Sequence, residues 1–225
     1  MAYFTSDFNE FFKELAANNN KDWFDENRNR YHKNIKEPFE KFVGALMAEL
    51  RKDDPELTGD PKKAIFRINR DIRFAKDKSP YKLNRSAAIS KHGRKDGARP
   101  GLYFELGPEL VRIAGGVYSP DKDQLMVVRS AIMKNQSKFQ EAINDPNFVE
   151  TFGEIQGDEN KRLPTKELMK AAEKEPLLFK KQFFYSAEFS PEIITDNLLV
   201  DFIAEKHRDA KPVREFFEEA LSQID

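Results

Sequence analysis

The chain has 225 residues, with 38 Lys or Arg, 39 Asp or Glu and no cysteine, so its formal net charge is −1. The lack of cysteine excludes a disulfide-stapled module, a thiol redox motif and a thiolate zinc site. The balanced charge excludes a wholly basic nucleic-acid binder and an acidic tail protein. Because the sequence shows no signal peptide and no apolar stretch near ~20 residues, we expect a soluble, cytoplasmic protein without a membrane partner.

The first fifty residues predict helices with an aromatic core face. Thr5-Ser6-Asp7 is typical of a helix start, and Asn18-Asn19-Asn20 ends this first helix. Apolar residues recur at helical spacing from Trp23 to Leu50, and Pro38 predicts either two helices or one kinked helix. We expect the phenylalanines here and near the C-terminus to form core, and an exposed remnant of them would suit a homodimer patch. They are Phe8, Phe11, Phe12, Phe216 and Phe217.

The middle of the chain changes to strand-like patterns. Residues 65–74 alternate at period two, residues 77–80 are turn-like, and a second strand is expected within residues 81–90. Residues 102–106 and 110–114 then read as a hairpin that ends at Gly115-Gly116.

Helix starts dominate the remaining sequence. They lie at Ser119-Pro120-Asp121, Asp145-Pro146, Thr165 and Ser190-Pro191-Glu192, with one late strand expected at residues 182–189. Helices, then strands, then helices predict an α+β fold whose mainly antiparallel sheet is flanked by N-terminal and C-terminal helices. No repeat or linker divides the sequence, so we expect a single domain over residues 1–225.

Positive charge is concentrated in residues 62–99. This segment holds thirteen Lys or Arg against three Asp, a net charge of +10, while the rest of the chain, with 25 basic and 36 acidic residues, carries −11. Such a division within one chain suggests a surface that faces an anion.

Strand pleating sharpens this expectation. Arg70 lies among apolar residues on the even face of the predicted strand, and a buried guanidinium requires a carboxylate, carbonyls or a bound anion. Asp71 points to the other face of a regular strand and so cannot serve as that partner. A plausible hairpin register places Arg73 opposite Lys82 and Arg70 opposite Arg85, which is unfavourable unless an anion or a carboxylate relieves it.

These patterns leave three hypotheses for the basic strand–turn–strand segment, residues 65–85. It binds a small phosphate- or carboxylate-bearing ligand; or it belongs to an enzyme acting on a phosphorylated substrate, with an aspartate orienting the attacking group; or its charges form an internal salt-bridge network in a structural or interaction protein. Nucleic acid is a further possible partner and ranks below a small ligand. The candidate ligand-binding residues are Arg67, Arg70, Asp71, Arg73, Lys76, Asp77, Lys78, Tyr81 and Lys82.

Motifs for other chemistry are missing from the sequence. The three histidines, at positions 32, 92 and 207, have no metal-ligand spacing, so we predict no metal site. No glycine-rich phosphate loop and no nucleophile elbow occurs, and the sequence assigns neither catalytic residues nor a cofactor.

The stretch from Phe66 to Lys82, FRINRDIRFAKDKSPYK, resembles the characteristic motif of the family called domain of unknown function 2461. The similarity extends to residues 18–24, Tyr103, the Gly115-Gly116 pair and Ser119-Pro120, and so covers most of the chain. The resemblance implies a compact soluble protein with a motif under shared constraint, and it implies no particular activity.

Overall fold

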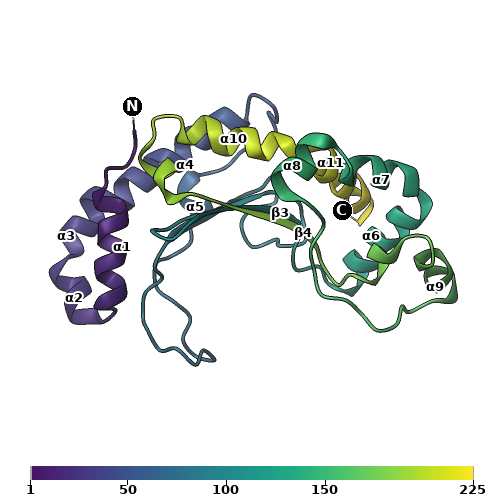
Figure 1. Ribbon diagram of the computed structural model, residues 1–225, viewed down its shortest axis with the longest axis horizontal. Coiled ribbons are helices and arrows are strands. Elements are labelled where there is room, and N and C mark those ends of the chain that lie inside the picture. The colour runs from purple at the N-terminus through teal and green to yellow at the C-terminus, as the bar shows by residue number, and fades with distance from the viewer. Residues whose placement is uncertain (1, 225) are drawn as a thin grey trace. The chain divides into compact units, whose positions relative to one another are not determined.

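The computed structural model describes residues 2–224, in which helices precede and follow a four-stranded antiparallel sheet (Figure 1). This arrangement confirms the predicted α+β class. The strands, in the sheet order β1-β2-β3-β4, are β1 (Arg85–Ile89), β2 (Leu102–Leu106), β3 (Val111–Val117) and β4 (Phe183–Phe189).

Helices make up most of the remaining regular structure. The α-helices are α1 (Asp7–Ala17), α2 (Lys21–Glu26), α3 (Arg28–Tyr31), α4 (Glu37–Leu50), α5 (Pro61–Ala64), α6 (Lys122–Lys134), α7 (Gln136–Ile143), α8 (Pro146–Phe152), α9 (Lys166–Ala172), α10 (Leu199–Asp209) and α11 (Lys211–Leu221). The π-helix η1 covers His32–Lys36, and the 3-10 helices are η2 (Pro176–Phe179), η3 (Pro191–Thr195) and η4 (Ser222–Ile224). None of the helices among residues 2–224 is both long and apolar enough to cross a bilayer.

The chain divides into two compact units, each built from segments that are distant in sequence. Unit 1 runs to Arg94 and adds residues 103–113 and 188–205; unit 2 consists of residues 95–102, 114–187 and the chain from Lys206 onward. That the whole chain forms one domain stays a prediction.

In unit 1, helix α4 covers one face of strand β2. Phe39 and Phe42 of α4 lie 5.9 and 5.7 Å from Phe104 between ring centroids, and all three side chains are fully buried. The helical run from Arg28 to Leu50 is continuous, with the π-helical turn η1 directly before Pro38. Because proline has no N–H to donate four residues back, a widened turn is a natural way to accommodate it.

In unit 2, the start of α6 and the Gly115-Gly116 pair of β3 can be compared with the expected helix start and turn. Helix α6 begins after Asp121, whose side chain caps it in a reciprocal pair with Gln124, two residues later than the expected start at Ser119. The hairpin does not end at Gly115-Gly116 as expected, because β3 continues through both glycines to Val117. The glycines permit close packing instead, since a Cβ at Gly115 would lie 2.4 Å from the Tyr185 hydroxyl. The five phenylalanines expected in the core are all buried, in both units.

The predicted strand over residues 65–74 is wrong. Only two isolated antiparallel bridges form, Ile65 with Ala87 and Asn69 with Tyr81, and the ladder ends there. The predicted register is also wrong, since the Arg70 amide donates to the Pro80 carbonyl at 2.9 Å and Arg70 does not lie opposite Arg85. Alternation continues in the sequence beyond Asn69, but no partner strand is present to pair with it.

Candidate functional site

The loop between the two arms of the basic segment, residues 70–80, is held by its own charges. Arg70 pairs with Asp77, and Arg73 pairs with Asp71 at 2.7 Å. Asp77 also accepts hydrogen bonds from the backbone N–H and hydroxyl of Ser79, at 2.9 and 2.6 Å. These donors, with Arg70, hold the pKa of Asp77 well below its ordinary value. Four of the nine candidate residues therefore satisfy one another.

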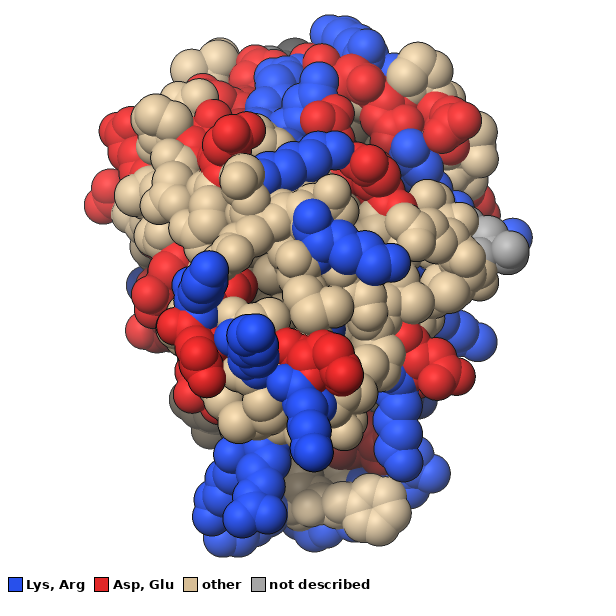
Figure 2. Space-filling model, turned by 90° about the vertical axis from the view of Figure 1, so that its right-hand side faces the viewer, with Lys and Arg blue, Asp and Glu red and all other residues tan. Residues whose placement is uncertain are grey.

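The remaining loop cations, Lys76 and Lys78, are exposed. The Lys78 ammonium donates to the Ile72 carbonyl at 2.9 Å. At the tip, Phe74 is 94% exposed, the most exposed large apolar side chain among the described residues, and the Arg73 guanidinium lies 5.9 Å from its ring centre. Figure 1 shows this segment, in blue, extending away from the sheet on the side opposite α4. Figure 2 shows Lys and Arg side chains gathered at that lower end beside an exposed aromatic ring.

Tyr81 is a packing residue. Its ring stacks on Phe24 at 4.1 Å between centroids, and only 7% of its surface is exposed. The backbone of Tyr81 exchanges two hydrogen bonds with the Asn19 side chain, which ties the loop to the start of α2. Burial raises the pKa of the Tyr81 hydroxyl. The residue anchors the base of the loop.

Two further cations, Lys82 and Arg94, lie beside the ring of Phe66. The Lys82 ammonium lies 5.2 Å and the Arg94 guanidinium 5.0 Å from the centre of the Phe66 ring, within the range of cation–π attraction. Arg94 also donates to the Ile65 carbonyl. We call Lys82 and Arg94, together with Arg67 and Arg85, whose positive charges act on Lys82, the Phe66 cation cluster.

The charges of this cluster affect one another. Burial lowers the pKa of Lys82, and repulsion from Arg85, Arg67 and Arg94 lowers it further, while Glu105 partly offsets this. Within residues 2–224, no carboxylate lies at ion-pair distance from any of the four cations of the cluster.

Arg85 is the most unusual member. Only 4% of its surface is exposed, its guanidinium lies 5.2 Å from the Phe39 ring centre, and its buried Nε has no hydrogen-bond partner among the described residues. Burial lowers its pKa, and the Coulombic effects of Tyr31 and Glu40 only partly oppose that shift. A buried guanidinium nitrogen without a hydrogen-bond partner is costly, and an anion near the group would reduce that cost.

The nearest carboxylate in the sheet is already engaged. Glu105 on β2 accepts a hydrogen bond from the Tyr103 hydroxyl and pairs with Arg112 on β3, both at 2.9 Å, and Arg112 continues to Glu188. Burial and the Glu105 charge raise the pKa of Tyr103, so its hydroxyl stays protonated near neutral pH. Glu105 therefore cannot neutralise the cluster without releasing Arg112.

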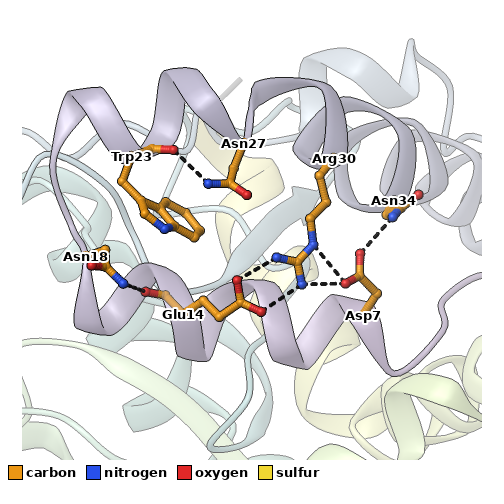
Figure 3. Close-up of polar contacts among 7 residues, drawn as sticks. All are labelled: Asp7, Glu14, Asn18, Trp23, Asn27, Arg30 and Asn34. Carbon is orange, nitrogen blue, oxygen red and sulfur yellow. Dashed lines mark hydrogen bonds and ion pairs between the residues drawn. The ribbon is translucent and has the colours of Figure 1, made fainter.

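The N-terminal helices provide a contrasting arginine (Figure 3). Arg30 donates to Asp7 and to Glu14, and Asn34 donates to the second oxygen of Asp7 at 2.7 Å. Hydrogen bonding to these carboxylates raises the pKa of Arg30, and the same contact lowers that of Asp7. This arginine also lies over a phenyl ring, that of Phe11 at 5.6 Å, but its charge is fully matched.

The structure thus divides the nine predicted residues. Arg70, Asp71, Arg73 and Asp77 pair within the loop, Lys76 and Lys78 lie on it, Tyr81 is core, and Lys82 and Arg67 join the cation cluster. Two of the cluster's members, Arg85 and Arg94, were missed. Arg85 had a detectable signal, since it starts the apolar strand Arg85–Ile89 and faces inward, whereas Arg94 sits in a polar loop that gives none.

No set of three or more His, Asp or Glu residues within 2–224 is arranged to hold a metal ion.

A comparison with models of protein families matches residues 7–216 to the family described as "Conserved hypothetical protein (DUF2461)". The chain belongs to this family. The match includes the Phe66 cation cluster, the loop and the N-terminal network. No curated protein and no solved structure matches.

Proposed function

We propose that this protein binds a phosphate- or carboxylate-bearing anion at the Phe66 cation cluster. The observation that carries the proposal is Arg85, a residue that is 4% exposed and whose guanidinium Nε has no hydrogen-bond partner among residues 2–224. Proteins rarely leave a buried charge unpaired, because several kcal/mol of hydration are lost. An anion would supply the missing partner.

The surroundings of Arg85 support this proposal. Lys82 and Arg94 approach one phenyl ring, and the pKa of Lys82 is lowered by burial and by neighbouring positive charges. A bound anion would relieve both effects at once, since opposite charge favours the protonated amine. We therefore propose the ligand site at the Phe66 cation cluster and not at the loop, residues 70–80.

The loop itself fits the structural hypothesis better. Its two ion pairs, Arg70 with Asp77 and Arg73 with Asp71, satisfy these side chains locally. They support a role in holding the shape of the loop. An enzymatic role on a phosphorylated substrate stays a hypothesis. Asp71 and Asp77, the aspartates expected to orient the attacking group, are paired with Arg73 and Arg70.

The test is thermal unfolding in increasing concentrations of inorganic phosphate and of citrate, at constant ionic strength. A ligand that binds only the folded state raises the melting temperature with its concentration. We expect the wild-type protein to show this response, and Arg94→Ala and Lys82→Met to lose most of it.

Arg28→Ala is the matched control. Arg28 also lies over a phenyl ring, that of Phe24 at 5.8 Å, but it is paired with Asp25. The control should keep the full response to anions. An equal response in all four proteins, or no response in the wild type, would contradict a site at the cluster.

A further inference from the structure

The exposed ring of Phe74 is not explained by packing. It is 94% exposed, and the residues beside it in the chain, Arg73 and Ala75, do not cover it. Water contact with a whole phenyl ring is unfavourable relative to a buried ring. A partner that covers the ring would recover this free energy.

Positive charge continues from this ring to the base of the loop. Lys76 and Lys78 lie near the tip, and Arg67, Lys82 and Arg94 lie at the base. Together with the ion-paired residues, loop residues 70–80 carry four cations and two aspartates, so the loop remains net positive. An aromatic ring on a basic track is the arrangement with which proteins bind single-stranded nucleic acid, by stacking bases and contacting phosphates.

We propose that the loop and the Phe66 cation cluster together bind single-stranded nucleic acid, with a base stacked on Phe74 and phosphates along the cations. This inference rests on the proposed function, because the cluster supplies the phosphate contacts at the base. Phe74 adds the contact that a small anion would not need.

Geometry favours a flexible polymer over a flat anionic membrane. The eleven residues from Arg70 to Pro80 can carry the tip up to about 17 Å from the last paired residues, and Figure 1 shows the loop extended from the sheet. A membrane that touched the tip would interact weakly with cations at the base, since the Debye length is about 8 Å at physiological salt. A single strand can follow the loop and reach both.

The experiment measures fluorescence anisotropy of labelled oligothymidylate and oligouridylate with the full-length protein. With about four phosphates neutralised, affinity should fall about 50-fold between 50 and 200 mM salt. Phe74→Ala should weaken binding about 5- to 150-fold, the range expected for losing one stacked base. Phe74→Trp should bind at least as tightly as the wild type.

Phe74→Leu separates stacking from simple apolar contact. Leucine keeps an apolar tip but has no π face, so it should bind oligonucleotides as weakly as the alanine variant. Leu198→Ala is the matched control, since Leu198 is also an exposed apolar residue of unit 1, at 56%, and lies far from the loop in sequence. This control should leave affinity unchanged.

Three results would overturn the inference. One is wild-type binding that Phe74→Ala does not weaken, and a second is no oligonucleotide binding at 50 mM salt. The third is retention of wild type and Phe74→Leu on phosphatidylserine vesicles without binding to oligonucleotides, which would indicate a membrane contact. Phosphate-dependent stabilisation with no oligonucleotide binding would reject this inference and leave the small-anion site standing. If the wild-type protein shows neither phosphate-dependent stabilisation nor oligonucleotide binding, both the small-anion site and the nucleic-acid site are rejected.

Discussion

Arg30 and Arg85 show how differently one residue type is treated within unit 1. Both guanidinium groups lie within 6 Å of a phenyl ring centre, and both belong to regular structure. Arg30 is clamped by the carboxylates of Asp7 and Glu14, whereas the buried Nε of Arg85 has no partner among the described residues. The first arginine is thus matched by carboxylates of the chain, whereas, within the described part of the chain, the second has only the Phe39 ring and the Coulombic effects of Tyr31 and Glu40 to offset its burial.

Replacing each arginine by methionine should give the largest difference in the free energy of unfolding. Arg30→Met leaves Asp7 and Glu14 without their cation and should lower the free energy of unfolding by about 2–3 kcal/mol. Arg85→Met removes a buried, unpaired charge and keeps an unbranched apolar side chain on Phe39, so stability should stay equal or rise. Urea unfolding of both variants in phosphate-free buffer measures this. A strong loss of stability in Arg85→Met would show that Arg85 is structurally satisfied.

Removing the negative charge of Asp7, which pairs with Arg30, should lower the free energy of unfolding by a smaller amount. Asp7→Asn removes the charge but keeps an oxygen for Arg30, so we expect a loss of about 1–2 kcal/mol. The lowered pKa of Asp7 also predicts a pH dependence. Its contribution should be complete above the ordinary carboxyl pKa, near 4, and should disappear as the pH falls through the lowered folded-state value. Urea midpoints of wild type and variant should converge in that acidic range.

The amine of Lys82 should report on the cluster directly. Its pKa is lowered in the folded state, so the protonated amine opposes folding, and stability from this group should rise as the pH increases from the folded-state pKa toward the ordinary lysine value. NMR titration of the ¹³C-methylated amine should show a depressed pKa that rises when phosphate is added. A normal pKa, unchanged by phosphate, would argue against a bound anion.

The smallest effect is expected in the loop. The pKa of Asp71 is lowered to about 2 by its contact with Arg73, yet both groups are exposed to water. Exposed pairs contribute little to stability. Asp71→Asn should therefore leave the urea midpoint unchanged, while a faster proteolytic cleavage within residues 70–80 would reveal a looser loop. A clear shift of the midpoint would mean that the loop is part of the cooperative core.

Local patterns in the sequence determined much of this protein. Helical spacing placed Phe8, Phe11 and Phe12 in the core, and the cap at Asp145 and the hairpin at residues 102–114 followed from short-range chemistry. The charge count singled out residues 62–99 without any knowledge of the fold. Such features depend on neighbours within a few residues, so the sequence contains the information directly.

Tertiary structure alone decided which cations are matched. The alternation from Ile65 to Phe74 predicted a strand, but pairing stopped at Asn69 because strand pairing requires a partner at the right place, which alternation cannot supply. Arg70 found Asp77 across a loop, and Arg85 was buried against Phe39, contacts between residues 7 and 46 positions apart. Charge compensation is a property of three-dimensional proximity, and so only the folded chain shows which of its cations lack a carboxylate.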